Sequence, residues 1–265
     1  MSFYAKTQRS QRRKGASETF DPPLRLFASL RKNFLTPHRG LIMPIKNLRR
    51  RLATPPDPFL VTQRSIERVQ SLVESAGPNA TIFNVGAGYT SLGERVVNID
   101  IFDSGTTDII ASAMALPFPD NCADLVILQG VLEHVEDASG TLAESFRVLK
   151  PGGLFYTEMP FLQPYHESPI DLRRSTKNGL ATLCEPLIEI ESGIHIGPAA
   201  TFAWFMREFW ARLLSGGRPS VYAKASTLIG WFVFPMRYAD HFLEKLPHLH
   251  TIASSCYYLG RKEQS

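Results

Sequence analysis

The stretch Thr81-Ile82-Phe83-Asn84-Val85-Gly86-Ala87-Gly88 decides the fold of this chain, because it joins a short apolar strand directly to a Gly-x-Gly loop. Glycine has no side chain to exclude a ligand, so the backbone N–H groups of such a loop can approach a bound molecule closely. A second apolar run, residues 96–101, carries Asp100 near its end, where an acid accepts hydrogen bonds from ribose hydroxyls. Together these features predict a nucleotide site, and a tight turn between two strands is the alternative.

A dinucleotide is the first ligand to consider for such a loop. Its fingerprint needs a third glycine at the sixth position, where this chain has Ser91. It also needs a helix whose N-terminus faces the pyrophosphate, and the spacing between Val85 and Val96 is too short for a full crossover helix. The sequence therefore favours a nucleotide-like ligand without a pyrophosphate.

Apolar runs that alternate with helical segments continue outward from this stretch. The expected strands are residues 81–85, 96–101, 108–111, 125–128, 154–159, 187–190 and 252–259. The expected helices are residues 62–75, 138–149 and 176–184, with more within residues 200–246. The helix at 138–149 should stop at the turn Lys150-Pro151-Gly152-Gly153. This order predicts an α/β fold with parallel strand pairs.

The chain divides by composition into four parts. The breaker cluster Thr54-Pro55-Pro56-Asp57-Pro58 marks the end of an N-terminal arm. The predicted organisation is a basic arm (residues 1–58), a core (59–199), an aromatic-rich helical insert or cap (200–250) and a final core strand (251–265).

The arm concentrates the positive charge of the chain. Residues 1–51 contain 13 Lys or Arg against two acidic residues, although the whole chain has a formal charge of only +4. A basic arm on an acidic body indicates a phosphate partner, either nucleic acid or anionic lipid. A disordered, solvating tail is the alternative.

The cysteines and apolar runs indicate the compartment. Cys122, Cys184 and Cys256 form no CxxC pair, which argues against a zinc site or a disulfide framework and favours a reducing compartment. No leader peptide is visible, and no apolar run approaches the roughly 20 residues that span a membrane. We expect a cytoplasmic protein, with peripheral binding at the inner membrane face as a further expectation.

Four ordered blocks follow the glycine loop: Ala115–Asn121, Ala123–Val126, Val131–Val135 and Arg147–Gly153. With them, residues 80–180 resemble the class I S-adenosylmethionine-dependent methyltransferase superfamily, in the type 11 branch common in bacteria. The resemblance implies a Rossmann-like sheet of seven strands whose last strand, here Ser255–Leu259, is reversed. It also implies S-adenosyl-L-methionine as cofactor and methyl transfer as activity.

The resemblance carries cofactor roles to particular positions. Gly86 and Gly88 would pass under the methionine part, Asp100 would hold the ribose, and Ile101 would lie against the adenine. Ala113 and Met114 would line the adenine pocket, and Gln129 and Gly130 would face the reactive sulfur. Asn84 precedes the glycine loop and is the last of the cofactor positions. Two positions depart from the usual pattern, because Asn84 and Ser112 stand where the superfamily usually has acids.

Candidate catalytic residues follow the fourth and fifth strands, at the edge where open α/β sheets bind ligands. A hydroxyl or amine acceptor needs a base within hydrogen-bond reach. The sequence predicts His166 as that base, with Asp171 orienting it or the substrate. His134 is a second candidate, and a structural role bonded to the backbone is its alternative. No metal is expected.

The acceptor is expected to be a small molecule, a sugar or a lipid-linked glycan. The Asn/Asp-Pro-Pro-aromatic loop of amino-directed nucleic-acid methyltransferases is absent, since residues 128–131 are Leu-Gln-Gly-Val, so nucleic acid is disfavoured. Aromatic and basic residues crowd residues 202–242, which suits either a cap on the sheet or an anionic membrane surface. A degenerate binding module and an RNA methyltransferase guided by the arm are the alternative functions.

Overall fold

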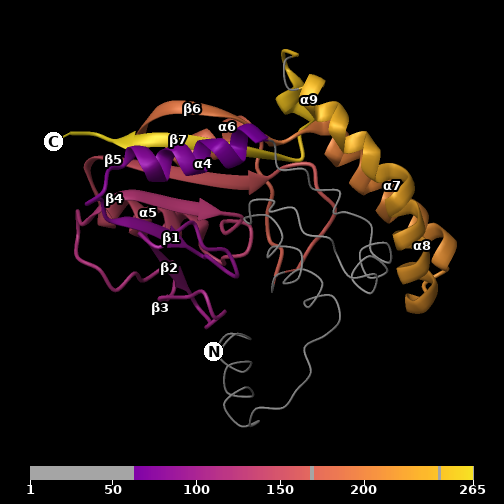
Figure 1. Ribbon diagram of the computed structural model, residues 1–265, viewed down its shortest axis with the longest axis horizontal. Helices are drawn as coiled ribbons and strands as arrows, with labels where there is room; N and C mark the ends of the chain where they lie inside the picture. Colours follow the sequence, from indigo (N-terminus) through magenta and orange to yellow (C-terminus); the bar gives the residue numbers. More distant parts are fainter. Residues whose placement is uncertain (1–62, 168–169, 244–245, 265) are drawn as a thin grey trace, which may run out of the picture. The chain divides into compact units, whose positions relative to one another are not determined.

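The computed structural model describes residues 63–167, 170–243 and 246–264. The expected arm, residues 1–58, and the breaker cluster at its end therefore lie outside the described residues. Within the described part, the fold is a seven-stranded sheet with helices on both faces (Figure 1).

The strand order is β3-β2-β1-β4-β5-β7-β6. The first five strands pair in parallel, whereas β7 runs antiparallel between β5 and β6. The strands are β1 Ile82–Val85, β2 Val96–Asp100, β3 Ile109–Ile110, β4 Ala123–Gln129, β5 Leu149–Pro160, β6 Leu187–Ile196 and β7 Ser255–Lys262. The expected fold class, including the reversed last strand, is confirmed.

Chain order reverses between β1 and β4, which are neighbours at the centre of the sheet. In open α/β sheets, ligands bind outside the carboxyl ends of the strands at such a switch point. Residues 86–95, which connect β1 to β2, form turns and no helix, as the short spacing predicts.

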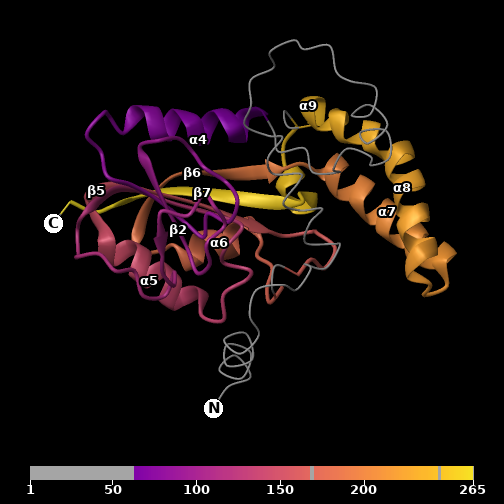
Figure 2. The same cartoon turned by 60° about the horizontal axis from the view of Figure 1, so that its bottom comes forward.

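Three helices cover the sheet. Helix α4, Gln63–Ser75, lies on one face, and α5, Ala138–Val148, and α6, Lys177–Leu183, lie on the other (Figure 2). The spacing of Val69, Leu72 and Val73 puts all three on one side of α4, where they are buried against the sheet. Helix α5 begins where the Asp137 carboxylate accepts the Gly140 amide at 2.8 Å, a side-chain N-cap.

Helical segments occupy the sequence between β6 and β7. They are α7 Pro198–Ser215, α8 Pro219–Val233, the 3-10 turn η1 Phe234–Ala239, α9 Asp240–Leu243 and the 3-10 turn η2 Leu249–Ile252. Helices α7 and α8 run side by side (Figures 1 and 2). The first turn of α7 is capped by Asp240, whose buried carboxylate accepts the amides of Ala199 and Ala200 at 2.8 and 2.9 Å.

The largest differences from the predicted strand boundaries are in β5, β6 and β7. Strand β6 continues to Ile196 rather than ending at 190, because it is an edge strand whose polar residues pair with β7 alone. Strand β7 begins at Ser255, since residues up to Ile252 form η2. The expected turn Lys150–Gly153 lies inside β5, where the pairing register shifts and Gly152 takes a φ of +78°.

Candidate functional site

The glycine loop lies directly after β1 and is held against the end of β2. The amides of Gly86 and Ala87 both donate to the Ile99 carbonyl, at 2.8 and 3.1 Å. The Gly88 amide donates to the Asp100 carboxylate at 2.7 Å. Gly86 and Gly88 have φ values of +70° and +53°, which glycine adopts without strain. The loop and the acid singled out by the sequence are therefore in contact.

Packing as well as backbone conformation requires glycine at position 86. A Cβ placed there would lie 2.4 Å from a γ-methyl carbon of Val131, which follows β4. The connections after β1 and β4 thus meet at the switch point of the sheet, and any side chain at 86 would separate them.

The surroundings of Asp100 suit a partly apolar ligand. Asp100 is buried, and its second oxygen lies 3.4 Å from the Phe102 amide, a long hydrogen bond. Ile101 and Phe102, the next two residues, are half exposed. Strand β3 pairs with β2 through Asp100 and Ile110, so Met114, which follows β3, is expected at the same edge; its side chain is 45% exposed.

The two positions that depart from the family pattern make internal hydrogen bonds. The Asn84 amide nitrogen donates to the side-chain oxygen of Asn98 at 3.0 Å and to the Thr90 carbonyl at 3.4 Å. Asn84 therefore ties the glycine loop to β2. Ser112 accepts the Met114 amide at 3.2 Å, and so fixes the turn that carries Ala113.

Gln129 and Gly130 lie at the carboxyl end of β4. The Gln129 side chain donates to Glu158 of β5 at 3.2 Å. Gly130 has a φ of +63°, and a Cβ there would lie 3.3 Å from Oε1 of Glu133. Glu133 therefore lies beside the position where the resemblance puts the reactive sulfur.

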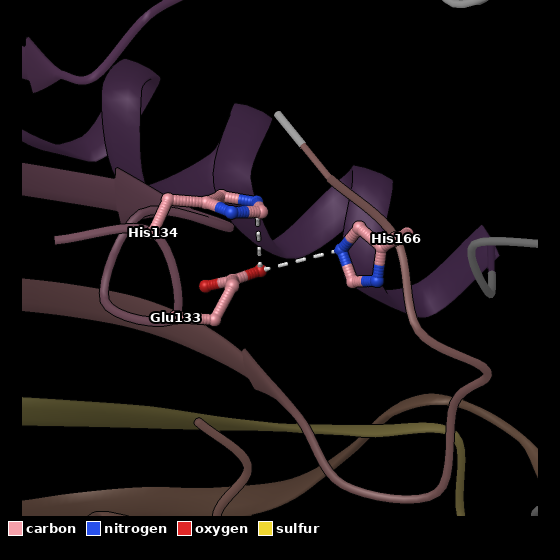
Figure 3. Close-up of side chains that lie close together, drawn as sticks. All are labelled: Glu133, His134 and His166. Carbon is pink, nitrogen blue, oxygen red and sulfur yellow. Dashed lines mark ion pairs between the residues drawn. The ribbon is translucent and has the colours of Figure 1, made fainter. Parts of the chain in front are cut away.

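Glu133 is the centre of a three-residue cluster with His134 and His166 (Figure 3). Its Oε1 lies 3.7 Å from Nε2 of His134 and 4.0 Å from Nε2 of His166. The two imidazole rings meet edge to face with centroids 5.3 Å apart. The structure thus brings together the two histidines that the sequence offered as alternatives.

Asp171 lies behind His166, as the sequence predicts. Its Oδ2 is 3.5 Å from Nδ1 of His166 and accepts the His166 backbone amide at 2.8 Å. Arg174 binds both carboxylate oxygens of Asp171. Although burial raises the pKa of Asp171, the bonds from Arg174 and the His166 amide hold it below its usual range. Asp171 is thus an ionised group in contact with His166.

Burial shifts the two acid–base groups of the cluster in opposite directions. It lowers the pKa of His166 to about 4 and raises the pKa of Glu133 to about 7. The Glu133 side chain is only 4% exposed, and its Oε2 has no hydrogen-bond partner within the part of the chain that the structure describes. Desolvation is the cause in both residues, because it disfavours the charged form of each.

Two polar groups of the site are not among the residues predicted from the sequence. Glu133 belongs to a motif of the resemblance, and its position directly before His134 was a usable signal. The second group is Glu158, which accepts the Tyr156 hydroxyl at 2.7 Å and lies 3.2 Å from His195 on β6. No local spacing predicts the contact between Glu158 and His195, since they lie on β5 and β6, two strands that flank β7 in the sheet.

Trp204 links α7 to the cluster. Its buried ring lies 5.9 Å from that of His166, centroid to centroid. The helical segment after β6 therefore contributes to the wall beside His166.

Comparison with known proteins matches the central part of the chain to one family. Residues 85–157 match the family model described as a methyltransferase domain. This range begins at the glycine loop and ends within β5, so it contains Asp100, Gly130 and the Glu133-His134 pair.

Two curated relatives are similar over part of their length. A demethylmenaquinone methyltransferase of Symbiobacterium thermophilum is 38% identical over 72 residues, which is 27% of this chain and 29% of the relative. A ubiquinone/menaquinone biosynthesis C-methyltransferase of Pseudoalteromonas translucida is 34% identical over 90 residues, 34% of this chain and 32% of the relative. The matches thus span about a third of these relatives.

A solved structure is similar over nearly the whole chain. The crystal structure of the [4+2]-cyclase SpnF has a TM-score of 0.51 and 16% identity, covering 91% of this chain and 93% of that one. At this identity the similarity shows the fold alone.

Proposed function

Because the chain carries a class I S-adenosylmethionine-dependent methyltransferase domain, we propose that the protein transfers the methyl group of S-adenosyl-L-methionine to a small-molecule acceptor bound beside Glu133, His134 and His166. The observation that carries the proposal is the contact between the glycine loop and Asp100 at the switch point, with Gly130 beside the cluster.

The residues present fit the cofactor. The loop has the positive φ angles that let its backbone approach the methionine part, and Asp100 is an acid beside half-exposed apolar residues, suited to a ribose and a ring. In this proposal Gly86 and Gly88 bind the methionine part and Asp100 binds the ribose. The adenine contacts Ile101, Ala113 and Met114, while Gln129 and Gly130 face the sulfur and Asn84 holds the loop.

Methyl transfer is a direct displacement, in which the acceptor atom bonds to the methyl carbon as the carbon–sulfur bond breaks. The protein mainly holds the three atoms in line and accepts any proton that the acceptor releases. We assign the proton to His166, oriented by Asp171, with His134 as its neighbour. Burial lowers the pKa of His166 to about 4, so the ring is neutral at physiological pH but is a weaker base than an exposed imidazole. The Asp171 carboxylate acts against this by stabilising the protonated ring.

The chemical class of the methyl acceptor is a separate part of this proposal. The curated relatives are named for quinone biosynthesis, which supports a quinone-type ring. The basic arm and the aromatic segment in the sequence favour a sugar or a lipid-linked glycan. Residues 128–131 after β4 lack the Asn/Asp-Pro-Pro-aromatic loop of amino-directed nucleic-acid methyltransferases, which disfavours nucleobases as acceptors. All the favoured acceptors are small or amphipathic molecules that present a hydroxyl or ring carbon.

Peripheral contact with an anionic membrane is a further part of this proposal. No helix among the described residues is long and apolar enough to cross a membrane. Helices α7 and α8 nevertheless expose large apolar side chains: Phe202, Phe205, Phe209, Trp210, Leu213, Leu214, Leu228 and Phe232. Rings of this kind suit the head-group depth of a bilayer. Cosedimentation with vesicles containing phosphatidylglycerol should exceed that with phosphatidylcholine alone.

The function is tested with methyl-labelled cofactor and three separate acceptors: a demethylated quinol, a lipid-linked glycan fraction and total RNA. We expect label in one of the first two. Label in RNA alone would replace this proposal with an RNA methyltransferase, and cofactor binding without transfer to any acceptor would indicate a binding module. With the acceptor found, His166→Asn should lower the turnover number, and an unchanged rate across pH would exclude His166 as the base.

A further inference from the structure

The Glu133, His134 and His166 cluster has the composition and spacing of a metal site. The three side chains come from two segments, one after β4 and one after β5, and each offers one ligand atom. These atoms, a carboxylate oxygen and two Nε2 atoms, all lie within 4.8 Å of one another. Zinc-bound ligands lie about 3.3 Å apart for bonds of about 2.0 Å. The observed 3.7 and 4.0 Å contacts need only a small inward movement.

Each histidine has polar groups at its other ring nitrogen. Nδ1 of His134 contacts the Ile170 carbonyl, whereas Nδ1 of His166 lies 3.4 Å from a guanidinium nitrogen of Arg174 and 3.5 Å from the Asp171 carboxylate. These contacts hold both rings with Nε2 toward Glu133, and the Ile170 carbonyl favours the proton on Nδ1 of His134. Metal-binding histidines typically make this type of contact with their second nitrogen.

An independent observation is the state of the Glu133 carboxylate. It is almost fully buried, and within the described residues Oε2 has no hydrogen-bond partner. A buried carboxylate is costly unless a proton, a hydrogen bond or a cation compensates it. The nearby Arg174 is engaged with Asp171 instead. A cation among the three ligand atoms would compensate the carboxylate directly.

We propose that Glu133, His134 and His166 bind one divalent transition-metal ion, of the zinc, manganese, cobalt or ferrous class. Two imidazoles and one carboxylate favour these ions over magnesium and calcium, which prefer oxygen ligands alone. The two histidine side chains are each 15% exposed, which leaves a route for the ion and for further oxygen ligands.

A metal ion at this site would also take part in the proposed methyl transfer, and this part of the inference rests on the proposed function. An acceptor oxygen on the ion would become more acidic and would be fixed beside Gly130, near the sulfur position. With the ion bound, Nε2 of His166 is a ligand, so the base role proposed above for His166 applies only to the metal-free protein. In the metal-bound protein the ion would lower the pKa of the acceptor oxygen, the released proton would pass to solvent, and Asp171 would position a ligand.

The test is a titration of tag-free, chelator-treated full-length protein with Co²⁺ alone, followed by absorption spectroscopy and by metal analysis after gel filtration. We expect one Co²⁺ per chain with visible d–d bands. Glu133→Gln and His166→Gln should each remove the bands and weaken binding more than about 100-fold, and Asp171→Asn should weaken it about 10- to 100-fold.

His248→Asn is the matched control, because His248 is exposed and has a φ of +65°, which asparagine tolerates. It should bind Co²⁺ as the unmodified chain does. If Glu133→Gln fails to fold, His166→Gln gives the same result independently. Equal binding by all variants, or no stoichiometric Co²⁺, would overturn the metal site. The Co²⁺ titrations contain no S-adenosylmethionine. A failure of cofactor binding, measured separately, would therefore count against the proposed function and not against the metal site.

Discussion

The backbone amide of Gly88 donates a 2.7 Å hydrogen bond to the carboxylate of Asp100. The two residues belong to different connections, one after β1 and the other at the end of β2, and the bond fixes their separation. A ribose bound by Asp100 would therefore lie next to the loop that contacts the rest of the ligand. This relationship underlies the assignment of the cofactor site.

Gly86→Ala should weaken binding of S-adenosylmethionine by at least about tenfold, equivalent to about 1.4 kcal/mol. The added Cβ would lie 2.4 Å from Val131 and would require a strained φ of +70°. Isothermal titration measures the change. Gly77→Ala is the control, since Gly77 also has a positive φ but a Cβ there meets open space. It should lower stability and leave cofactor affinity unchanged.

Adding Val131→Ala to Gly86→Ala should restore only part of the affinity. The double variant removes the contacts at 2.4 and 3.1 Å but keeps the backbone strain at position 86. Full recovery would mean that packing alone, and not the conformation of the loop, explains the need for glycine. No recovery would mean that Val131 is not the obstacle.

Asp240→Ala should destabilise the protein by about 2 kcal/mol, the upper range for loss of a helix cap. The buried carboxylate accepts two amides in the first turn of α7, and both would lose their partner. Urea denaturation gives the unfolding free energy. Cofactor affinity should stay constant, and a variant as stable as the unmodified protein would show that this cap does not hold α7.

His195→Gln should reduce the loss of stability that occurs on acidification. Although Glu158 raises the pKa of His195, burial lowers it more, so the folded protein keeps this ring neutral. The unfolded chain then binds more protons as the pH falls through 6.5, and stability falls with it. Unfolding free energies at pH 7.5 and 5.5 should show a smaller drop for the variant. An equal drop in unfolding free energy for the variant and the unmodified protein would contradict a lowered pKa for His195.

The parts of the fold that local sequence determines were predicted well. The parallel strands, the loop at Gly86, and the absence of a helix before Val96 each follow from a run of residues and its neighbours. The length of β6 was underestimated because an edge strand has no apolar alternation to mark its end. The turn at Gly152 was correct as a break in the helix, but pairing with β4 carries the strand through it.

The candidate site was only partly predictable. The sequence places His134 and His166 after neighbouring strands, so their shared edge could be expected. Their common contact with Glu133 could not, because it depends on how two loops pack and on burial of the carboxylate. No metal is expected from the sequence, because the histidines such as His248 and His250 lack the carboxylate or cysteine spacing of a ligand set, and the proposed metal site depends on the packing of two loops.

The most direct measurement is isothermal titration of S-adenosylmethionine into the full chain and into Asp100→Asn, with Asp103→Asn as the matched exposed control. The account predicts one site per chain, no displacement by NAD⁺, and a roughly 10- to 100-fold loss in Asp100→Asn, as expected for charge-assisted hydrogen bonds worth about 1.5–3 kcal/mol. Asp103→Asn should match the unmodified chain. Absence of binding, or equal affinity in all three proteins, would contradict the assignment of the glycine loop and Asp100 as the cofactor site.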